Sequence, residues 1–440
     1  MQHKRRWCAW PALPGLALCG NHAAKDECVP AATYRQSRAL NVACSRVPCP
    51  LDSRHSVLAA ELTAHLRVCN AAREAAAATA AVHLQPGCNG GGESTSDDDD
   101  GEAAEAEALA LWQCRDEGDA LEAARQAVRA VADALLAAAA ATAPLPEPAS
   151  EPQCVSAAFA ALRAAAGAAH ATTPFDARHA TQQAGIVSHM HAAGLLPPPS
   201  DGAVYVELGA GRGYLTHFLA EAYAEAHASY LLVERRAYRH KAERSLRREA
   251  FVSRLKCDVT DLDLATAPLP PPAVMPLGPR RLVAIAKHLC GSGTDAALRC
   301  ASRATAADGS RVLFGIAVAP CCHHACKWRI FCGKQALRRR GIGPLQFALA
   351  SRMASWAVCA GGASNDDADA EHPSLPPATD ARWGLSAAER RAVGVAAKQL
   401  FDAARAEWAP SRCGGKALLV SYCAPQVSPE HRLLVLRSDE

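Results

Sequence analysis

The 440-residue sequence has no run of 18 or more large apolar residues, so it predicts no membrane-spanning helix. Its formal net charge is only +3, so no overall basic field indicates a nucleic-acid partner. The basic start, Met1–Arg6, lacks the apolar segment of a secretory signal peptide, and an organelle transit peptide is the alternative for it. Cysteine, in contrast, is plentiful. Several of the 19 cysteines stand near histidines, a pattern that favours metal ligands over disulfides.

One stretch, Val204–Leu219, organises the rest of the chain. A short apolar run, Val204–Leu208, predicts a buried strand, and a segment with helical spacing follows after a glycine-rich turn. A dinucleotide-binding fingerprint would need glycine where Tyr214 stands. An acid on the strand, Glu207, followed by alternating glycines is instead similar to the first motif of the S-adenosylmethionine (SAM) methyltransferases, in which the acid faces the amino-acid part of SAM. The glycines, which let a ligand lie against bare backbone, are Gly209, Gly211 and Gly213.

The next two strands also end in acids. Residues 229–233 end in Glu234, 21 residues after Gly213, where nucleotide-binding α/β folds place a carboxylate that accepts hydrogen bonds from ribose hydroxyls. A third strand ends in Asp258, where methyltransferases of this kind often place an acid near the adenine. We therefore expect an α/β fold, with a Rossmann-like SAM-dependent methyltransferase domain. A protein with such a domain and so many free cysteines is expected to be intracellular, in the nucleus or the cytoplasm.

Two later strands lead into polar segments. Residues 282–286 precede Lys287–Gly291, and residues 311–318 precede Cys321–Cys326. Because ligands bind at the carboxyl edge of open α/β sheets, both segments are in position for chemistry. A metal site is the alternative for the second segment. We favour a catalytic or substrate-binding loop, because adjacent residues cannot all face one ion.

The first 70 residues predict two small zinc modules. Their ligand spacings, C-x10-C-x2-H-x5-C and C-x5-H-x9-H-x3-C, allow tetrahedral coordination. Such modules have too little core to fold alone, and roughly 10–16 kcal/mol of apparent zinc binding energy supplies the difference. Scattered thiols are the alternative. The expected ligands are Cys8, Cys19, His22 and Cys28 in the first module, and Cys49, His55, His65 and Cys69 in the second.

Composition suggests how the chain is divided. A glycine-rich tract with four consecutive aspartates predicts a flexible acidic linker. The basic segment Arg235–Arg248 predicts a helix that either contacts phosphates or forms a solvated face. A polar, proline-bearing tract at 360–382 predicts a disordered insertion. The expected boundaries are 5–30 and 44–72 for the zinc modules, 86–102 for the linker, 103–172 for an alanine-rich helical region and 175–440 for the methyltransferase domain.

Several motifs together carry a family resemblance. They are the paired zinc modules with Val47–Asp52 and His65–Asn70, the glycine turn, Lys287–Gly291, Cys321–His324 and Ser428–Glu430. With them the chain resembles the eukaryotic tRNA ribose 2′-O-methyltransferases that modify nucleotide 4 of the acceptor stem.

The resemblance implies SAM as methyl donor, two structural zinc ions, the ribose 2′-hydroxyl as acceptor and the tRNA acceptor stem as partner. The hydroxyl is a weak nucleophile and needs a base or an orienting group. The candidates, which the sequence does not rank, are Lys287, His288, His323 and His324. Alternatives are methylation of another RNA atom or of a protein, and a zinc-finger RNA-binding protein without catalysis.

Overall fold

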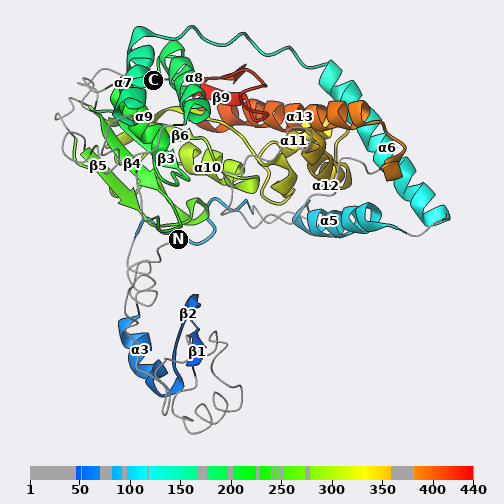
Figure 1. Ribbon diagram of the computed structural model, residues 1–440, viewed down its shortest axis with the longest axis horizontal. Coiled ribbons are helices and arrows are strands. Elements are labelled where there is room, and N and C mark those ends of the chain that lie inside the picture. The colour runs from blue at the N-terminus through cyan, green and yellow to red at the C-terminus, as the bar shows by residue number, and fades with distance from the viewer. Residues whose placement is uncertain are drawn as a thin grey trace, which may run out of the picture. The chain divides into compact units, whose positions relative to one another are not determined.

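The computed structural model of the chain divides into two compact units, Met1–Val82 and His83–Glu440, which are described separately (Figure 1). None of the helices in the described part of the chain is long and apolar enough to span a membrane. The described residues are 46–50, 52–69, 82–91, 97–115, 118–166, 176–196, 202–223, 228–238, 242, 246, 251–272, 278–357 and 381–439.

The first unit contains an antiparallel hairpin and a short helix. Strands β1 (Arg46–Cys49) and β2 (Asp52–Leu58) pair with a register shift between Pro48 and Cys49, and η2 (Ala59–Glu61) leads into α3 (Leu62–Val68). Among the residues of this unit that the structure describes, the buried hydrophobic ones are Cys49 and Cys69, and a bound metal ion is one way in which so small a fold gains stability.

The second unit is built around a seven-stranded sheet of order β5-β4-β3-β6-β7-β9-β8. The first five strands are parallel, and β9 is antiparallel to both of its neighbours. The order reverses at β3, so a crevice for a ligand is expected where the carboxyl ends of β3 and β6 separate. The strands are β3 (Val204–Leu208), β4 (Ser229–Val233), β5 (Phe251–Leu255), β6 (Arg280–Ala286), β7 (Arg311–Val318), β8 (Lys416–Ser421) and β9 (Arg432–Arg437).

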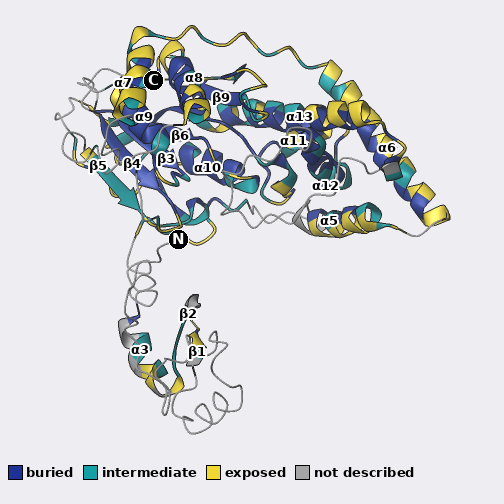
Figure 2. Ribbon diagram, viewed as in Figure 1, coloured by how far each residue is buried: buried dark blue, intermediate teal, exposed yellow. Residues whose placement is uncertain are grey.

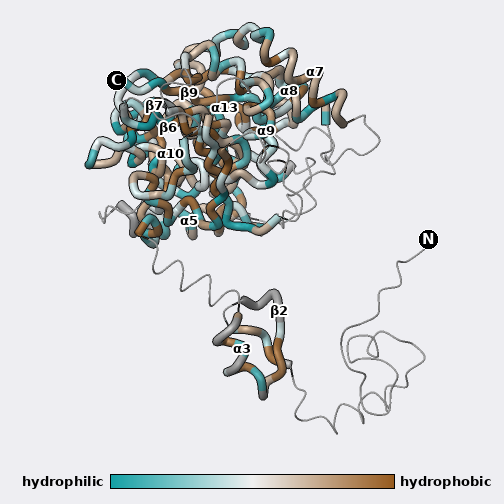
Figure 3. Tube along the Cα trace, turned by 90° about the vertical axis from the view of Figure 1, so that its left-hand side faces the viewer, coloured by the Kyte–Doolittle hydropathy of each residue, from teal (hydrophilic) through white to brown (hydrophobic). Residues whose placement is uncertain are grey.

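Helices cover both faces of this sheet, so its inner strands are apolar on both sides (Figure 2). Alternation along β3 shows the two faces: Tyr205 packs in one apolar cluster, and Val206 packs in the other. Figure 3 shows hydrophobic segments gathered among β6, β7 and α13. The first cluster includes α7 (Gln153–Ala166), α8 (Ala177–Ala192) and α9 (Tyr214–Ala222), and the second includes α10 (Ser292–Ser302) and the end of α13 (Ala387–Cys413).

A third apolar cluster joins the alanine-rich helices to the C-terminal half of the unit. Trp112 on α5 contacts Trp356 and Trp383, with ring centroids 5.5 and 5.1 Å apart. The alanine-rich region is therefore part of the same compact body as the sheet. The helices of this cluster are α5 (Asp97–Gln113), α6 (Asp119–Ala140), α11 (Lys334–Arg339), α12 (Pro344–Met353) and α13, with short turns η9 (Ala354–Ala357) and η11 (Ala381–Trp383).

The flexible linker expected at 86–102 is wrong for the residues that the structure describes there. Asn89 is buried, and its side-chain amide donates to the carbonyls of Val259 and Leu262 at 2.8 and 2.7 Å. The four aspartates begin α5 instead of forming a spacer. Acidic residues are favourable in the first turn of a helix, because the helix dipole places positive charge there.

Candidate active site and zinc finger

The glycine turn between β3 and α9 is shaped by backbone conformation. All three glycines have positive φ, which residues with a Cβ adopt reluctantly. Gly211 donates its N–H to Glu234 at 2.8 Å, and its carbonyl accepts from Arg254 at 3.0 Å. A Cβ at Gly211 would meet no atom within 4 Å, so space stays open beside this backbone. The turn is thus held in place and open on one side.

Three carboxylates lie at the carboxyl ends of three adjacent strands. Glu207 is 4% exposed and accepts from Thr216 N–H at 3.1 Å and from the Thr216 hydroxyl, in the first turn of α9. Glu234 follows β4, and its second oxygen accepts from Arg236 N–H at 2.8 Å. This row of acceptors beside the open glycine turn fits the amino acid and ribose of SAM.

Asp258 follows β5 and begins a short 3₁₀ turn, η7 (Val259–Asp261). One of its oxygens accepts from the backbone and hydroxyl of Thr260, at 3.0 and 2.9 Å, and the other accepts from Arg235 at 3.3 Å. Burial raises the pKa of this carboxyl, but the Thr260 and Arg235 contacts outweigh it and leave the pKa below its usual value. Asp258 is therefore an anion at the edge where the sequence predicted an acid near adenine.

Arg235 and Arg236 form a bend, and most of the basic helix expected at 235–248 lies outside the described residues.

Lys287 lies at the carboxyl end of β6, next to the strand that carries Glu207. Its side chain is buried, at 7% exposed for the residue. Burial lowers the pKa of the Lys287 ammonium to about 8, although Cys423, Glu207, Asp176 and Cys321 oppose the shift. The lowered pKa gives this amine a larger neutral fraction near physiological pH than an ordinary lysine has, and the neutral amine is the state a proton acceptor needs.

The other three candidate bases have different surroundings. His288 is exposed, and its ring lies 6.5 Å from that of His179 on α8. His324 is half-buried in η8 (His323–Ala325). His323 is 2% exposed, with Nε2 2.7 Å from Asp402 and Nδ1 3.5 Å from Glu430. The structure therefore groups Lys287 and His288 at the open edge and turns His323 into the core.

Three of the four expected ligands of the second zinc module lie close together. Cys49 and Cys69 are buried with their Sγ atoms 3.9 Å apart, and a ligand atom of His65 lies within 4.8 Å of both. Two thiolates on one tetrahedral zinc ion are about 3.8 Å apart, since each Zn–S bond is about 2.3 Å. His55 belongs to β2, and its side chain lies outside the described residues.

The first module, with Cys8, Cys19, His22 and Cys28, also lies outside the described residues, and so does most of the 360–382 insertion.

A sequence model of methyltransferase TRM13 matches residues 181–437, more than half of the chain. The chain belongs to the TRM13 methyltransferase family. A second model, of the U11-48K-like CHHC zinc finger, matches residues 46–70 and coincides with the module around Cys49 and Cys69. TRM13 membership implies SAM as the cofactor of this unit, and the CHHC finger implies zinc.

Named relatives extend over nearly the whole chain. The tRNA:m(4)X modification enzyme TRM13 of Eremothecium gossypii is 28% identical over 99% of this chain and 93% of its own length. The TRM13 homolog of Mus musculus is 26% identical over 99% of this chain and 92% of its own length. The TRM13 enzyme of Oryza sativa is 32% identical over 55% of this chain and 89% of its own length. No solved structure matches the chain.

The sequence did not predict the buried network of charged side chains that links α13 to Asp295 and His323. Arg405 on α13 donates to both oxygens of Asp295, at 3.2 and 2.8 Å, and to Asp402 at 3.2 Å. Asp402 in turn forms a hydrogen bond with the Nε2 atom of His323. The available signal was a set of charged residues on the apolar face of a long amphipathic helix, where charges are rare unless paired.

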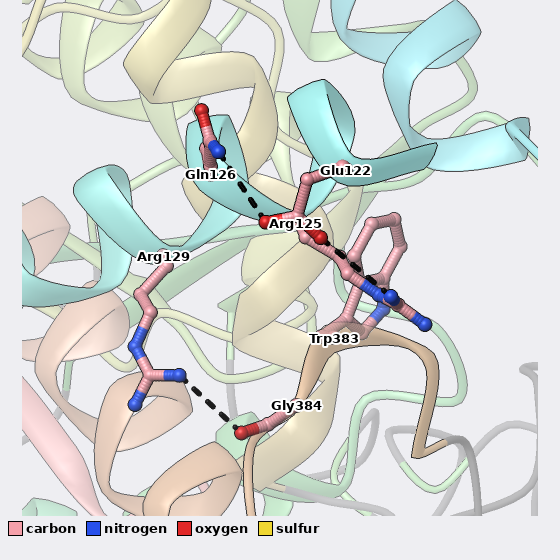
Figure 4. A pocket seen from close by; sticks show the side chains of 6 residues that line it. All are labelled: Glu122, Arg125, Gln126, Arg129, Trp383 and Gly384. Atoms are coloured by element: carbon pink, nitrogen blue, oxygen red, sulfur yellow. Dashed lines mark hydrogen bonds and ion pairs between the residues drawn. The ribbon is translucent and has the colours of Figure 1, made fainter. Parts of the chain in front are cut away.

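A surface pocket on α6 is separate from these groups (Figure 4). The polar groups that line it hydrogen-bond to one another: Gln126 donates to Glu122 at 3.3 Å, and Arg129 donates to the backbone carbonyl of Gly384 at 3.5 Å. None of its lining residues comes from the sheet edge. We assign it to the packing of α6 against the segment after the insertion.

Proposed function

We propose that this TRM13-family enzyme methylates the ribose 2′-hydroxyl of nucleotide 4 in the tRNA acceptor stem, with Lys287 as the base. The relatives are named tRNA:m(4)X modification enzymes, which supports tRNA as the substrate. The observation that carries the role of Lys287 is its burial at the edge that also holds Glu207 and the open glycine turn. The strand order, reversing at β3, supports a Rossmann-like arrangement of the methyltransferase domain.

The chemistry needs a proton acceptor at the open edge. When bound, SAM supplies an electrophilic methyl group. The 2′-oxygen would form the new O–C bond as the bond between the methyl group and sulfur breaks and the neutral thioether leaves, and the hydroxyl proton would pass to the Lys287 amine, which becomes an ammonium ion. Burial disfavours that positive charge, and Cys423 and Glu207 are among the groups that partly offset its cost. His288, the next residue in the chain, is exposed, and we assign to it the orientation of the ribose.

The N-terminal unit is proposed to bind the acceptor stem and to hold two zinc ions, one in each module. An A-form duplex displays its 2′-hydroxyls and phosphates rather than its base sequence, so shape and charge govern recognition. Transfer of a labelled methyl group to total tRNA, with the modified nucleotide mapped, tests the whole proposal. Label on a base, at another nucleotide or on protein would contradict it and favour one of the alternatives.

Replacing Glu234 by alanine should weaken SAM binding about tenfold or more, because each charge-assisted hydrogen bond to the ribose contributes roughly 1.5–3 kcal/mol. Glu234→Gln separates the role of the negative charge from that of the hydrogen bond to the glycine turn, since the amide oxygen still accepts from Gly211 N–H while the charge is lost. Asp308→Asn, on an exposed loop, is the matched control. Calorimetry that finds unchanged affinity for Glu234→Ala would place the cofactor elsewhere.

A chain shortened to residues 83–440 should keep its SAM affinity and lose tRNA affinity. The cut falls at the boundary between the two units, and Glu207, the glycine turn and Glu234 all lie in the second. Removing phosphate contacts should raise KM for tRNA about tenfold or more and leave kcat nearly unchanged. The Cys69→Ser variant of the full chain loses one zinc ligand but keeps the N-terminal unit, so it tests how much of the effect on tRNA affinity depends on zinc. Equal KM values for all three proteins would contradict the recognition role of the modules.

A further inference from the structure

Three thiols meet at the carboxyl ends of β6 and β7, outside the groups used above. Cys290 follows β6, and Cys321 and Cys322 follow β7. The three Sγ atoms all lie within 4.8 Å of one another. The backbones meet too: Cys290 and Cys321 form an isolated parallel bridge, and Gly291 N–H donates to the Cys321 carbonyl at 3.1 Å.

The backbone at Cys322 makes this convergence possible. Neighbouring side chains on an extended chain point to opposite sides, and for that reason the sequence disfavoured a metal here. Cys322, however, has φ 51° and ψ 44°, and it is the only residue other than glycine with positive φ in the described part of the chain. A left-handed conformation is unfavourable for a residue with a Cβ, and such outliers gather at functional sites. The left-handed residue thus lets the Sγ atoms of two adjacent cysteines lie close to each other and to that of Cys290.

The loops are also built for close approach. Gly291 has φ 55°, and a Cβ on it would lie 2.6 Å from the backbone of Ala325. Only glycine allows the loop after β6 to pack this closely on the loop after β7. The thiol cluster is therefore positioned by backbone contacts on both sides.

The chemistry of three thiols selects a thiophilic ion. Thiolates prefer zinc or copper(I) over magnesium or calcium. Three sulfurs on a tetrahedral zinc ion are about 3.8 Å apart, so the present separations need to contract by at most about 1 Å. The hydrogen bond with Cys290 and burial raise the pKa of Cys322 to about 12, although the hydrogen bond with Cys321 opposes the shift, so an ion must displace protons when it binds. None of the described cysteines forms a disulfide.

We propose that Cys290, Cys321 and Cys322 bind a further zinc ion, with solvent as the fourth ligand. Among the described residues, no other histidine, cysteine or carboxylate joins the group at that distance. The ion would link the loop that carries Lys287 to the loop that carries His324. The site is distinct from the N-terminal zinc modules and does not depend on the reaction proposed above.

The test is the zinc content of the full-length protein, purified under reducing conditions and measured by mass spectrometry. Cys290→Ser and Cys322→Ser should each contain about one zinc ion fewer per chain than the unmodified protein. Cys413→Ser, a half-buried cysteine outside the cluster, is the control and should keep the full content. Cys290→His should retain the ion, since imidazole is also a zinc ligand; Cys290 is exposed, so these changes are compatible with folding.

Cobalt substitution supplies a readout that a folding defect cannot imitate. The thiolate-to-cobalt absorption of the unmodified protein should exceed that of Cys290→Ser, and Cys290→His should restore tetrahedral cobalt bands with less thiolate absorption. Equal zinc content in Cys290→Ser, Cys322→Ser and Cys413→Ser would overturn the proposal. So would a disulfide among the three cysteines in the protein as purified, found by mass analysis without reduction.

Discussion

Replacing Lys287 by methionine should lower kcat for tRNA methylation by about 10²- to 10⁴-fold, the usual contribution of a positioned base. Methionine keeps the length and packing of the buried stem but has no proton acceptor. Lys287→Arg should be about as inactive, because a guanidinium stays protonated at any pH at which the protein is folded. The affinities for SAM and tRNA should change little, so the loss should appear in kcat.

The pH dependence has a definite sign. The neutral amine is the active form, so kcat should rise with pH up to about 8, the lowered pKa of Lys287, and then level off. The charged or titratable groups around the amine are Cys423 after β8, Glu207 on β3, Asp176 at the start of α8 and Cys321 after β7. All four raise the pKa when they are anionic, but burial outweighs them. Single-turnover rates measured across this pH range would determine the rising part of the pH–rate profile.

Lys416→Met is the matched control, because Lys416 is exposed on the far strand of the sheet. It should leave both kcat and the pH profile unchanged. If Lys287→Met kept kcat within about threefold of the unmodified enzyme, Lys287 would not be the base. His288 and His324, which are not fully buried, would then be the remaining candidates, each tested by replacement with asparagine.

The core of the site could be predicted because its signals are local. Glu207, the glycines and the helix after them are contiguous in sequence, and backbone conformation dictates the residue types. Glu234 and Asp258 also follow from local rules, since each ends a short apolar run. The register of the strands then brings the three acids to one edge, which the sequence predicted and the structure places at the ends of β3, β4 and β5.

The long-range parts could not be predicted in the same way. His323 and Asp402 are 79 positions apart, and nothing near His323 in sequence indicates a buried carboxylate partner. The convergence of Cys290 with Cys321 depends on the pairing of β6 with β7 and on one left-handed residue. Helix α5 depends on contacts as well, since Gly101 packs against Trp328, far along the chain. Tertiary contacts, not local propensity, decided these three features.

The buried network predicts the largest effect on stability. Replacing Arg405 by methionine should lower the free energy of unfolding of the second unit by about 3–5 kcal/mol, because it leaves the buried carboxylate of Asp295 without its cation. The side chains of Arg405 and Asp295 are 0% exposed, and their nearest atoms are 2.8 Å apart. The pKa of Asp402 is lowered to about 2, since His323, Arg405 and Arg432 together outweigh burial. Without Arg405, Asp295 must either take up a proton or remain buried as an anion, whereas Asp402 keeps His323 and Arg432.

The matched control is Arg339→Met on α11. Arg339 pairs with Glu407 at 2.8 Å, the same distance, but its side chain is 63% exposed, so the change should cost at most about 1 kcal/mol. Arg405→Lys keeps the charge and loses the two-pronged contact with Asp295, so it should fall between the two. Urea unfolding followed by the fluorescence of the buried Trp328 and Trp383 reports on this unit. If Arg405→Met were no less stable than Arg339→Met, the network would not hold the His323 loop in place. His323→Ala should then also leave stability unchanged, and a loss of kcat in that variant would return His323 to the candidate bases.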